Sequence, residues 1–301
     1  MIRERAEFVL YRFITRVVDR ATDDGARRQG ERIGLLAAKL LPKRRQLVLR
    51  NLAYVFPEKD LGERQAIARS CWKHFGSMTI DYVRKRHWTL DRIIGQVKLN
   101  GWEHLEQAMS RDRGVIVVTA HIGNWEIGLN VLSRAGVRVM TVARALDNEL
   151  LEEELYGVRR RSGIDLVDRR HAARPLIRAL EKKEIVVLLP DQAVQPREGV
   201  LVPFLDRPAW TTPAPARLAL RYDVPIVPMF CTLDNEPRLT LNIQQPIYPS
   251  ELAVELQTVE AVTAFMNERI SSAIRGKPEL WLWMHDRWKW TERKDAEASR
   301  F

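Results

Sequence analysis

Residues 115–119 read VIVVT, a continuous apolar run rich in β-branched side chains that is typical of a buried strand. The pattern then changes, because Asn124 suits the cap of a helix and the apolar residues after it recur at helical spacing. Gly123 allows the sharp bend between the two elements. We therefore expect His121 at the carboxyl end of a strand and Glu126 in the first turn of the next helix. Ligands bind at that edge of open α/β sheets, so this segment predicts both a fold class and a place for chemistry.

The chain after residue 114 repeats this alternation. Strands are predicted at 114–120, 137–144, 164–168, 184–190, 200–205, 224–232 and 238–245, and helices at 124–135, 148–161, 172–183, 212–222 and 257–275. Such alternation indicates a mostly parallel sheet with helices on both faces, and the short turn at 233–237 allows the last two strands to pair antiparallel. We predict an α/β fold with a layered αβα domain over residues 101–290.

The first hundred residues are predicted to be helical and basic. Residues 2–20 carry an apolar stripe at helical spacing, with arginines on the other faces. A helix of this kind can lie in the interface of an anionic membrane, or it can pack its stripe on the protein core, and both readings stay open. The predicted organisation is a membrane-proximal helical region 1–100, an α/β core 101–290 and a polar tail 291–301, in one structural unit.

Composition excludes several classes of protein. No run of 18 apolar residues is present, so no transmembrane helix is expected. The two cysteines, Cys71 and Cys231, lie in apolar segments. This favours a protein of the reducing cytoplasm in which both thiols are small core residues. The net charge of +10 suits an anionic lipid surface, an acidic carrier protein or a nucleic acid equally well. GxSxG, GxxxxGK[ST], GxGxxG and HExxH motifs are missing, so we expect no bound cofactor and no metal.

The spacing of His121 and Glu126 suggests general base chemistry. A neutral imidazole can take a proton from an alcohol, and a carboxylate on its other nitrogen fixes the tautomer. Because no serine or cysteine nucleophile is nearby, the acceptor hydroxyl would attack an activated acyl group directly. The alternative is structural, with His121 ending a strand and Glu126 complementing the helix dipole.

Four other polar residues are predicted at or near the same edge. Arg144 ends the second strand and could stabilise an oxyanion or bind a phosphate, or simply pair with a glutamate. Asp191 and Gln192 end the fourth strand, where Asp191 could orient Arg144, bind a sugar hydroxyl or cap the turn. Arg169 follows another strand and adds positive charge. With Asn124, the residues Asp191, Gln192 and Arg169 form the candidate substrate-binding set, and His121, Glu126 and Arg144 the candidate catalytic set.

Several collinear segments carry a family resemblance. They are RNLAYVFPE at 50–58, HIGNWE at 121–126, VARALDN at 142–148, PDQ at 190–192, GVLVPFL at 199–205 and WLWMHDRWKW at 281–290. Together they resemble the late lipid A biosynthesis acyltransferases of the Kdo-lipid A, lauroyl and myristoyl type, within the lysophospholipid acyltransferase superfamily. The resemblance implies a His-x4-Glu O-acyltransferase whose donor is an acyl-carrier-protein thioester or acyl-CoA. It also implies an acylated disaccharide lipid as acceptor, a catalytic role for Arg144, and a peripheral place on the cytoplasmic face of the inner membrane.

The sequence departs from that family at 205–210, where LDRPAW stands in place of a glycine-bearing FFG. A lysophospholipid, an ornithine lipid or a mannosylated phosphoinositide therefore stays open as acceptor, with the choice expected to lie in loops 192–199 and 205–212. A different class, a non-enzymatic basic protein that binds membranes or nucleic acid, would explain the charge. It would not explain a His–Glu pair at a sheet edge, so we expect no nucleic-acid partner.

Overall fold

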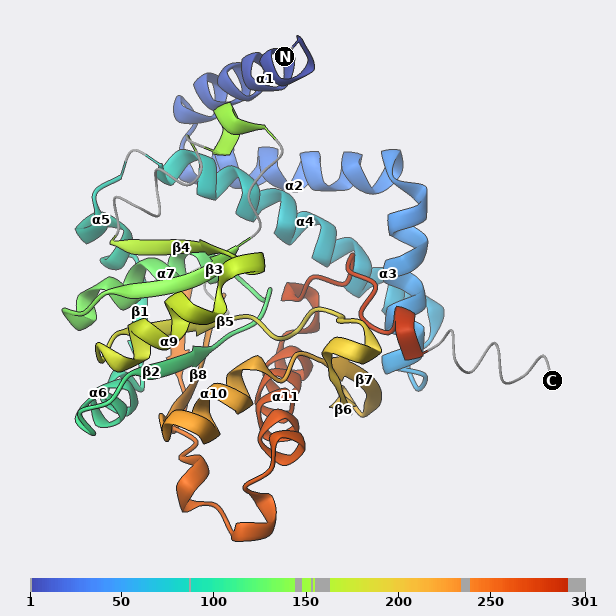
Figure 1. The fold of residues 1–301 in the computed structure, drawn as a ribbon. Coiled ribbons are helices and arrows are strands. Elements are labelled where there is room, and N and C mark those ends of the chain that lie inside the picture. The colour runs from blue at the N-terminus through green and yellow to red at the C-terminus, as the bar shows by residue number, and fades with distance from the viewer. Residues whose placement is uncertain are drawn as a thin grey trace.

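The computed structural model describes residues 2–86, 88–143, 148–152, 154, 163–233 and 239–291. Seven strands form the main sheet in the order β1-β9-β8-β2-β5-β3-β4 (Figure 1). They are β1 (Val97–Asn100), β2 (Val115–Val118), β3 (Val139–Ala143), β4 (Ile164–Asp168), β5 (Ile185–Leu188), β8 (Ile226–Leu233) and β9 (Leu239–Ile243). Among these described strands only the β8–β9 pair is antiparallel, and all other neighbours are parallel. The predicted mostly parallel sheet and its antiparallel last pair are confirmed.

Helices cover both faces of this sheet. Ile116 and Val118 of β2 belong to a core shared with α9 (Ala173–Glu181), α10 (Ala214–Tyr222) and α11 (Val259–Gly276). Val115 and Val117 point to the opposite core, shared with α5 (Leu90–Ile94), α6 (Trp102–Met109) and α7 (Trp125–Leu132). Successive side chains of a strand point to opposite faces of the sheet. Because helices cover both faces, all four residues of β2 are buried. The layered αβα prediction is confirmed.

Four long helices precede the sheet, as predicted, and the short α5 follows them. The four are α1 (Ile2–Asp19), α2 (Asp23–Leu40), α3 (Pro42–Val55) and α4 (Leu61–Lys85). In Figure 1, α1 and α2 lie across one end of the molecule, with α4 between α2 and the sheet. The α2 helix approaches α4 closely, since a Cβ atom on Gly34 would lie 1.9 Å from the Trp72 carbonyl oxygen. None of the described helices is long and apolar enough to cross a bilayer.

Two predictions about the region after residue 200 are wrong. The strand predicted at 200–205 is present as β6 (Val200–Phe204), but its expected place in the main sheet is wrong, because β6 pairs antiparallel with β7 (Arg207–Thr211) as a separate hairpin. The segment expected to be a loop at 205–212 is therefore mostly strand. Its turn is Leu205-Asp206, both with positive φ, which is the geometry of a tight two-residue hairpin. Pro203 and Pro208 lie opposite each other and hid the pairing, since proline is tolerated only where ladder hydrogen bonds are not needed.

The short elements β1 and α6 were not predicted either. β1 pairs with β9, so the main sheet begins inside the first hundred residues. Most of the predicted helix at 148–161, and the turn after residue 233, lie outside the described residues.

Candidate active site

The register of two neighbouring strands brings His121 and Asp191 together. β2 and β5 are parallel, with Val118 opposite Leu188, and the two polar residues each stand three positions past those strand ends. His121 Nδ1 lies 2.9 Å from Asp191 Oδ1, and the main-chain N–H of His121 donates to Oδ2, also at 2.9 Å. The pair therefore lies at the carboxyl edge of the sheet, where the sequence predicted chemistry.

The Asp191 carboxylate is 1% exposed and ionised. Burial alone would raise its pKa, but the charge of His121 and the hydrogen bonds from His121 and Trp281 lower the pKa to about 2. An ionised carboxylate accepts hydrogen bonds only, so the neutral form of His121 carries its proton on Nδ1 and leaves Nε2 as the basic nitrogen. The Gln192 amide nitrogen is 3.4 Å from that Nε2, and the His121 side chain is 22% exposed. This geometry can accept a proton from an incoming hydroxyl.

The orienting role that we expected of Glu126 needs correction. The carboxylate on His121 Nδ1 belongs to Asp191, whereas Glu126 Oε1 accepts a hydrogen bond of 3.1 Å from Trp125 Nε1. The Trp125 ring packs edge-on against the His121 ring, with centroids 5.1 Å apart and planes at 65°. Glu126 therefore acts on the imidazole indirectly, by holding the Trp125 ring that packs against it. The contact with Asp191 was missed because Glu126, five positions from His121 in sequence, was the obvious partner for the imidazole. The order of the strands in the sheet decides which residue lies beside His121.

The loop between His121 and α7 is fixed from several sides. Asn124 caps α7, since its Oδ1 accepts from Ile127 N at 3.2 Å, and its Nδ2 donates to Asp81 Oδ2 at 3.1 Å. Gly123 has φ +58°, and a Cβ atom there would lie 2.0 Å from the Cys231 carbonyl oxygen. Asn124 was predicted both as a cap and as a substrate-binding residue. The structure confirms the cap, and binding stays a prediction.

Of the two predicted arginines, the structure describes only Arg169. Arg169 follows β4 and is exposed, but β5 and β3 separate β4 from β2, so Arg169 is not brought to the His121–Asp191 pair. Arg144 lies outside the described residues. Across the described ranges, no three His, Cys, Asp or Glu side chains come together in a way that could hold a metal ion.

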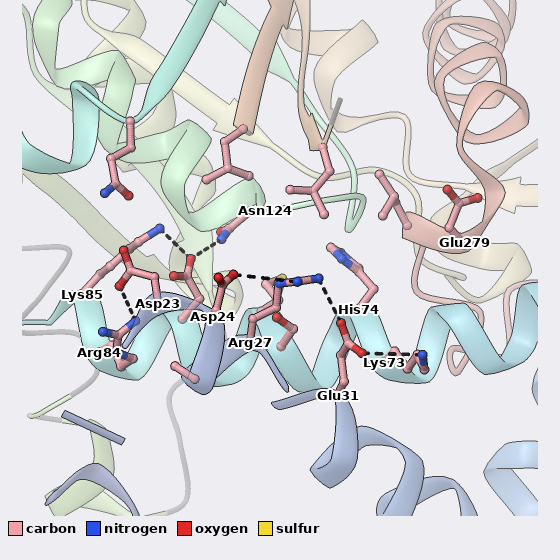
Figure 2. A pocket seen from close by; sticks show the side chains of 18 of the residues that line it. Asp23, Asp24, Arg27, Glu31, Lys73, His74, Arg84, Lys85, Asn124 and Glu279 are labelled. Carbon is pink, nitrogen blue, oxygen red and sulfur yellow. Dashed lines mark hydrogen bonds and ion pairs between the residues drawn. The ribbon is translucent and has the colours of Figure 1, made fainter. Parts of the chain in front are cut away.

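A pocket of about 880 Å³ lies behind the His121–Asn124 loop, between that loop and helices α2 and α4 (Figure 2). Its ion pairs join cations and carboxylates that line it, as Arg27 with Asp24 and Glu31, Lys73 with Glu31, Arg84 with Asp23, and Lys85 with Asp81. Asn124 and His74 line it, whereas His121 and Asp191 do not. The pocket therefore borders the Asn124 end of the loop, and the His121–Asp191 pair lies outside its lining.

His74 ties this pocket to the loop and makes the fold sensitive to acid. Its Nε2 donates to the Gly123 carbonyl oxygen at 3.1 Å, and burial lowers the pKa of His74 from 6.5 to about 4. Between these values the unfolded chain takes up a proton that the native chain does not. The stability contributed by neutral His74 is thus present above pH 6.5 and is lost as the pH falls toward 4.

The shift in the pKa of His74 makes the free energy of unfolding depend on pH by on the order of 3 kcal/mol between the two limits. We expect His74→Gln, which keeps a donor for Gly123, to remove this contribution. Denaturant unfolding at pH 7 and pH 4.5 measures it. Equal pH dependence in the variant and the wild type would contradict the assignment.

Comparisons with known proteins identify relatives of this chain. A profile of bacterial lipid A biosynthesis acyltransferases matches residues 3–290. The chain is 28% identical to the lipid A biosynthesis lauroyltransferase of Escherichia coli K12, over 91% of this chain and 88% of that protein. It is 27% identical to a lipid A biosynthesis acyltransferase of Haemophilus influenzae, over 83% and 79% of the two chains. A phosphatidylinositol mannoside acyltransferase of Mycobacterium tuberculosis H37Rv is also 27% identical, over 72% and 66%. The chain belongs to the bacterial lipid A biosynthesis acyltransferases, and hence to the acyltransferase class of enzymes.

Proposed function

We propose that this enzyme transfers a fatty acyl chain from an acyl-carrier-protein or CoA thioester to a hydroxyl of a lipid A precursor. The observation that carries the proposal is the His121–Asp191 pair, a buried ionised carboxylate holding a partly exposed imidazole at the edge of the sheet. The names of the relatives, lauroyl- and palmitoleoyltransferases of lipid A biosynthesis, supply the acceptor. The surplus of positive charge on this chain would attract an acidic carrier protein.

The proposed reaction proceeds without an acyl-enzyme. His121 Nε2 takes the proton of the acceptor hydroxyl as its oxygen attacks the thioester carbonyl, and Asp191 stabilises the imidazolium that forms. The tetrahedral intermediate then expels the thiolate, which takes the proton back from His121. The products are an O-acyl ester and a free thiol. Arg144 would stabilise the oxyanion or bind an acceptor phosphate.

The remaining predicted residues act around this centre. Glu126 holds Trp125 against the imidazole ring, so we assign it a positioning role. Among the substrate-binding candidates, Gln192 has the contact with His121 Nε2, since its side-chain amide lies beside this basic nitrogen. Asn124 would act through the loop that it caps, and Arg169 would contribute only long-range charge.

The direct test is an acyl-transfer assay in which products are read by mass spectrometry. Carrier-protein and CoA thioesters serve as donors, and a lipid A precursor, a lysophospholipid, an ornithine lipid and a phosphatidylinositol mannoside serve as acceptors. The similarity to a mannoside acyltransferase makes that lipid the second candidate. We expect an added acyl mass on the lipid A precursor only, formed far more slowly by His121→Ala. Wild-type transfer to another lipid would keep the mechanism and reject the acceptor.

We also propose that the enzyme attaches peripherally to the cytoplasmic face of the inner membrane, through α1 and the outer face of α2. Ile33, Leu36 and Leu40 form an exposed apolar row on α2, and Leu40 is 70% exposed. Four exposed cations flank the row, namely Arg28, Arg32, Lys39 and Lys43. Apolar side chains bordered by positive charge suit the headgroup region of an anionic bilayer. On α1, Val9 is exposed while Val18 packs against α2 and α4.

The double variant Leu36→Glu/Leu40→Glu is expected to weaken binding to anionic vesicles at least about tenfold, because two apolar contacts are lost and two repelled charges gained. Vesicle co-sedimentation measures the change. The matched control is Val254→Glu, because Val254 is 81% exposed and belongs to the segment between β9 and α11. In Figure 1 this orange segment lies at the end of the molecule opposite α1. Equal effects of the two changes would argue against docking through α2.

A further inference from the structure

Residues 280–287, which we call the clamp segment, contact both halves of the His121–Asp191 pair. On one side the contacts are main-chain hydrogen bonds to the His121 loop. Gly123 N donates to Leu280 O at 2.9 Å, and Leu282 N donates to His121 O at 3.1 Å. Between these bonds Ile122 and Trp281 form an antiparallel bridge. The loop after β2 is thus fixed by pairing with a segment about 160 residues further along the chain.

On the other side, three side chains of the clamp segment each contact a different residue of 191–193, in the turn after β5. Trp281 Nε1 donates to Asp191 Oδ2 at 2.9 Å, and Arg287 Nη1 donates to the Gln192 carbonyl oxygen at 3.4 Å. Ala193 N donates to His285 Nε2 at 2.9 Å. Since a main-chain N–H can only donate, His285 must be neutral, with its proton on Nδ1. Burial, which lowers the pKa of His285 to about 4, keeps it neutral at physiological pH.

The clamp segment is itself anchored in the protein. Asn51 of α3 donates to the carbonyl oxygens of Trp283 and His285 at 3.0 and 2.9 Å. Arg287 is 1% exposed and also donates to Trp210 O and Thr211 Oγ1 of β7, both at 2.6 Å. The turn after β5 is therefore connected to the β6–β7 hairpin through a buried guanidinium. A rigid outer layer of this kind fixes reactive groups more closely than strand ends alone can.

We propose that the clamp segment is the positioning element of the active site. Trp281, His285 and Arg287 are its positioning residues, and they set the distance and charge balance of the His121–Asp191 pair. This inference rests on the proposed function, in which His121 is the general base. The strand register brings the two residues near each other, but both lie beyond the β ladder. Their alignment at 2.9 Å therefore depends on contacts from outside the sheet.

The first test removes one hydrogen bond. Trp281→Phe takes the donor from Asp191 Oδ2, so the carboxylate holds the imidazolium of His121 more strongly. The acid limb of the kcat/KM profile is then expected to move to higher pH by on the order of 0.5–1 unit. Trp283→Phe is the matched control, because Trp283 is equally buried in the same segment but donates to the Pro278 carbonyl oxygen. Both variants should lose stability, and only Trp281→Phe should shift the profile.

The second test replaces one acceptor. His285→Gln can offer an amide oxygen to Ala193 N, whereas His285→Leu cannot. We expect His285→Leu to lower kcat about tenfold or more with little change in KM, and His285→Gln to restore most of that loss. Equal kcat in the two variants, or an unshifted profile in Trp281→Phe, would overturn the proposal.

A readout without substrate separates this proposal from the proposed function. Titration of His121 by NMR in ¹⁵N-histidine-labelled protein, assigned with His121→Gln, follows the imidazole directly. Trp281→Phe should move the His121 titration to higher pH even if no acyl acceptor is found, and Trp283→Phe should leave it in place. Absence of acyl transfer in the wild type would reject the function while the titration still decides the role of the clamp segment.

Discussion

The Asp191→Asn variant is expected to lose about 10³–10⁴-fold in kcat while keeping its fold and most of its substrate affinity. Asparagine has nearly the volume of aspartate, and its single oxygen can still accept from Trp281 Nε1. Its amide group then faces His121 Nδ1 and donates to it, which places the imidazole proton on Nε2. The nitrogen that should take the proton of the acceptor is thereby blocked. Steady-state kinetics with an acyl thioester and thermal unfolding measure the two quantities separately.

Comparison with Glu126→Gln makes this prediction specific. The new amide side chain would keep an acceptor oxygen for Trp125 Nε1, and the Asp191 contact with the imidazole would be untouched. The ¹⁵N shifts of His121 report its tautomer, and we expect the proton to leave Nδ1 in Asp191→Asn alone. If instead Glu126→Gln changed the tautomer and Asp191→Asn did not, the orienting carboxylate would be Glu126, as sequence spacing suggested.

The architecture was predictable because its signal is local. Buried parallel strands such as β2 and β5 are short β-branched runs, and the helices between them follow the helical period. β7 was missed because Pro208 and the turn at Leu205-Asp206 hide it, and β1 because four residues of mixed burial give little pattern. The exposed apolar row on α2 could not be predicted, because it is identified only once the opposite face of α2 is seen to pack on α4.

The edge of the sheet that holds the site was also predictable, but the pairing at that edge was not. His121, Asp191 and Gln192 were identified because each follows a predicted strand. Which strand ends meet depends on strand order, and β5 lies beside β2 although β3 and β4 intervene in sequence. The same holds for Trp281, which is 1% exposed, because no sequence pattern shows that its N–H reaches Asp191.

His121→Ala is expected to lower kcat at least as much as Asp191→Asn does, and so beyond the roughly 10²-fold that loss of a general base usually costs, because Asp191 acts through the imidazole. If His121 and Asp191 act as a unit, their effects should not add, because Asp191 contributes only through the imidazole that it orients. The double variant His121→Ala/Asp191→Asn should then be no slower than His121→Ala alone. A double variant slower by the product of the two single losses would mean that Asp191 acts on the substrate directly. Near-normal turnover of His121→Ala with the true donor and acceptor would remove the general base from the mechanism. Measured kcat values for the wild type, both single variants and the double variant decide between these outcomes.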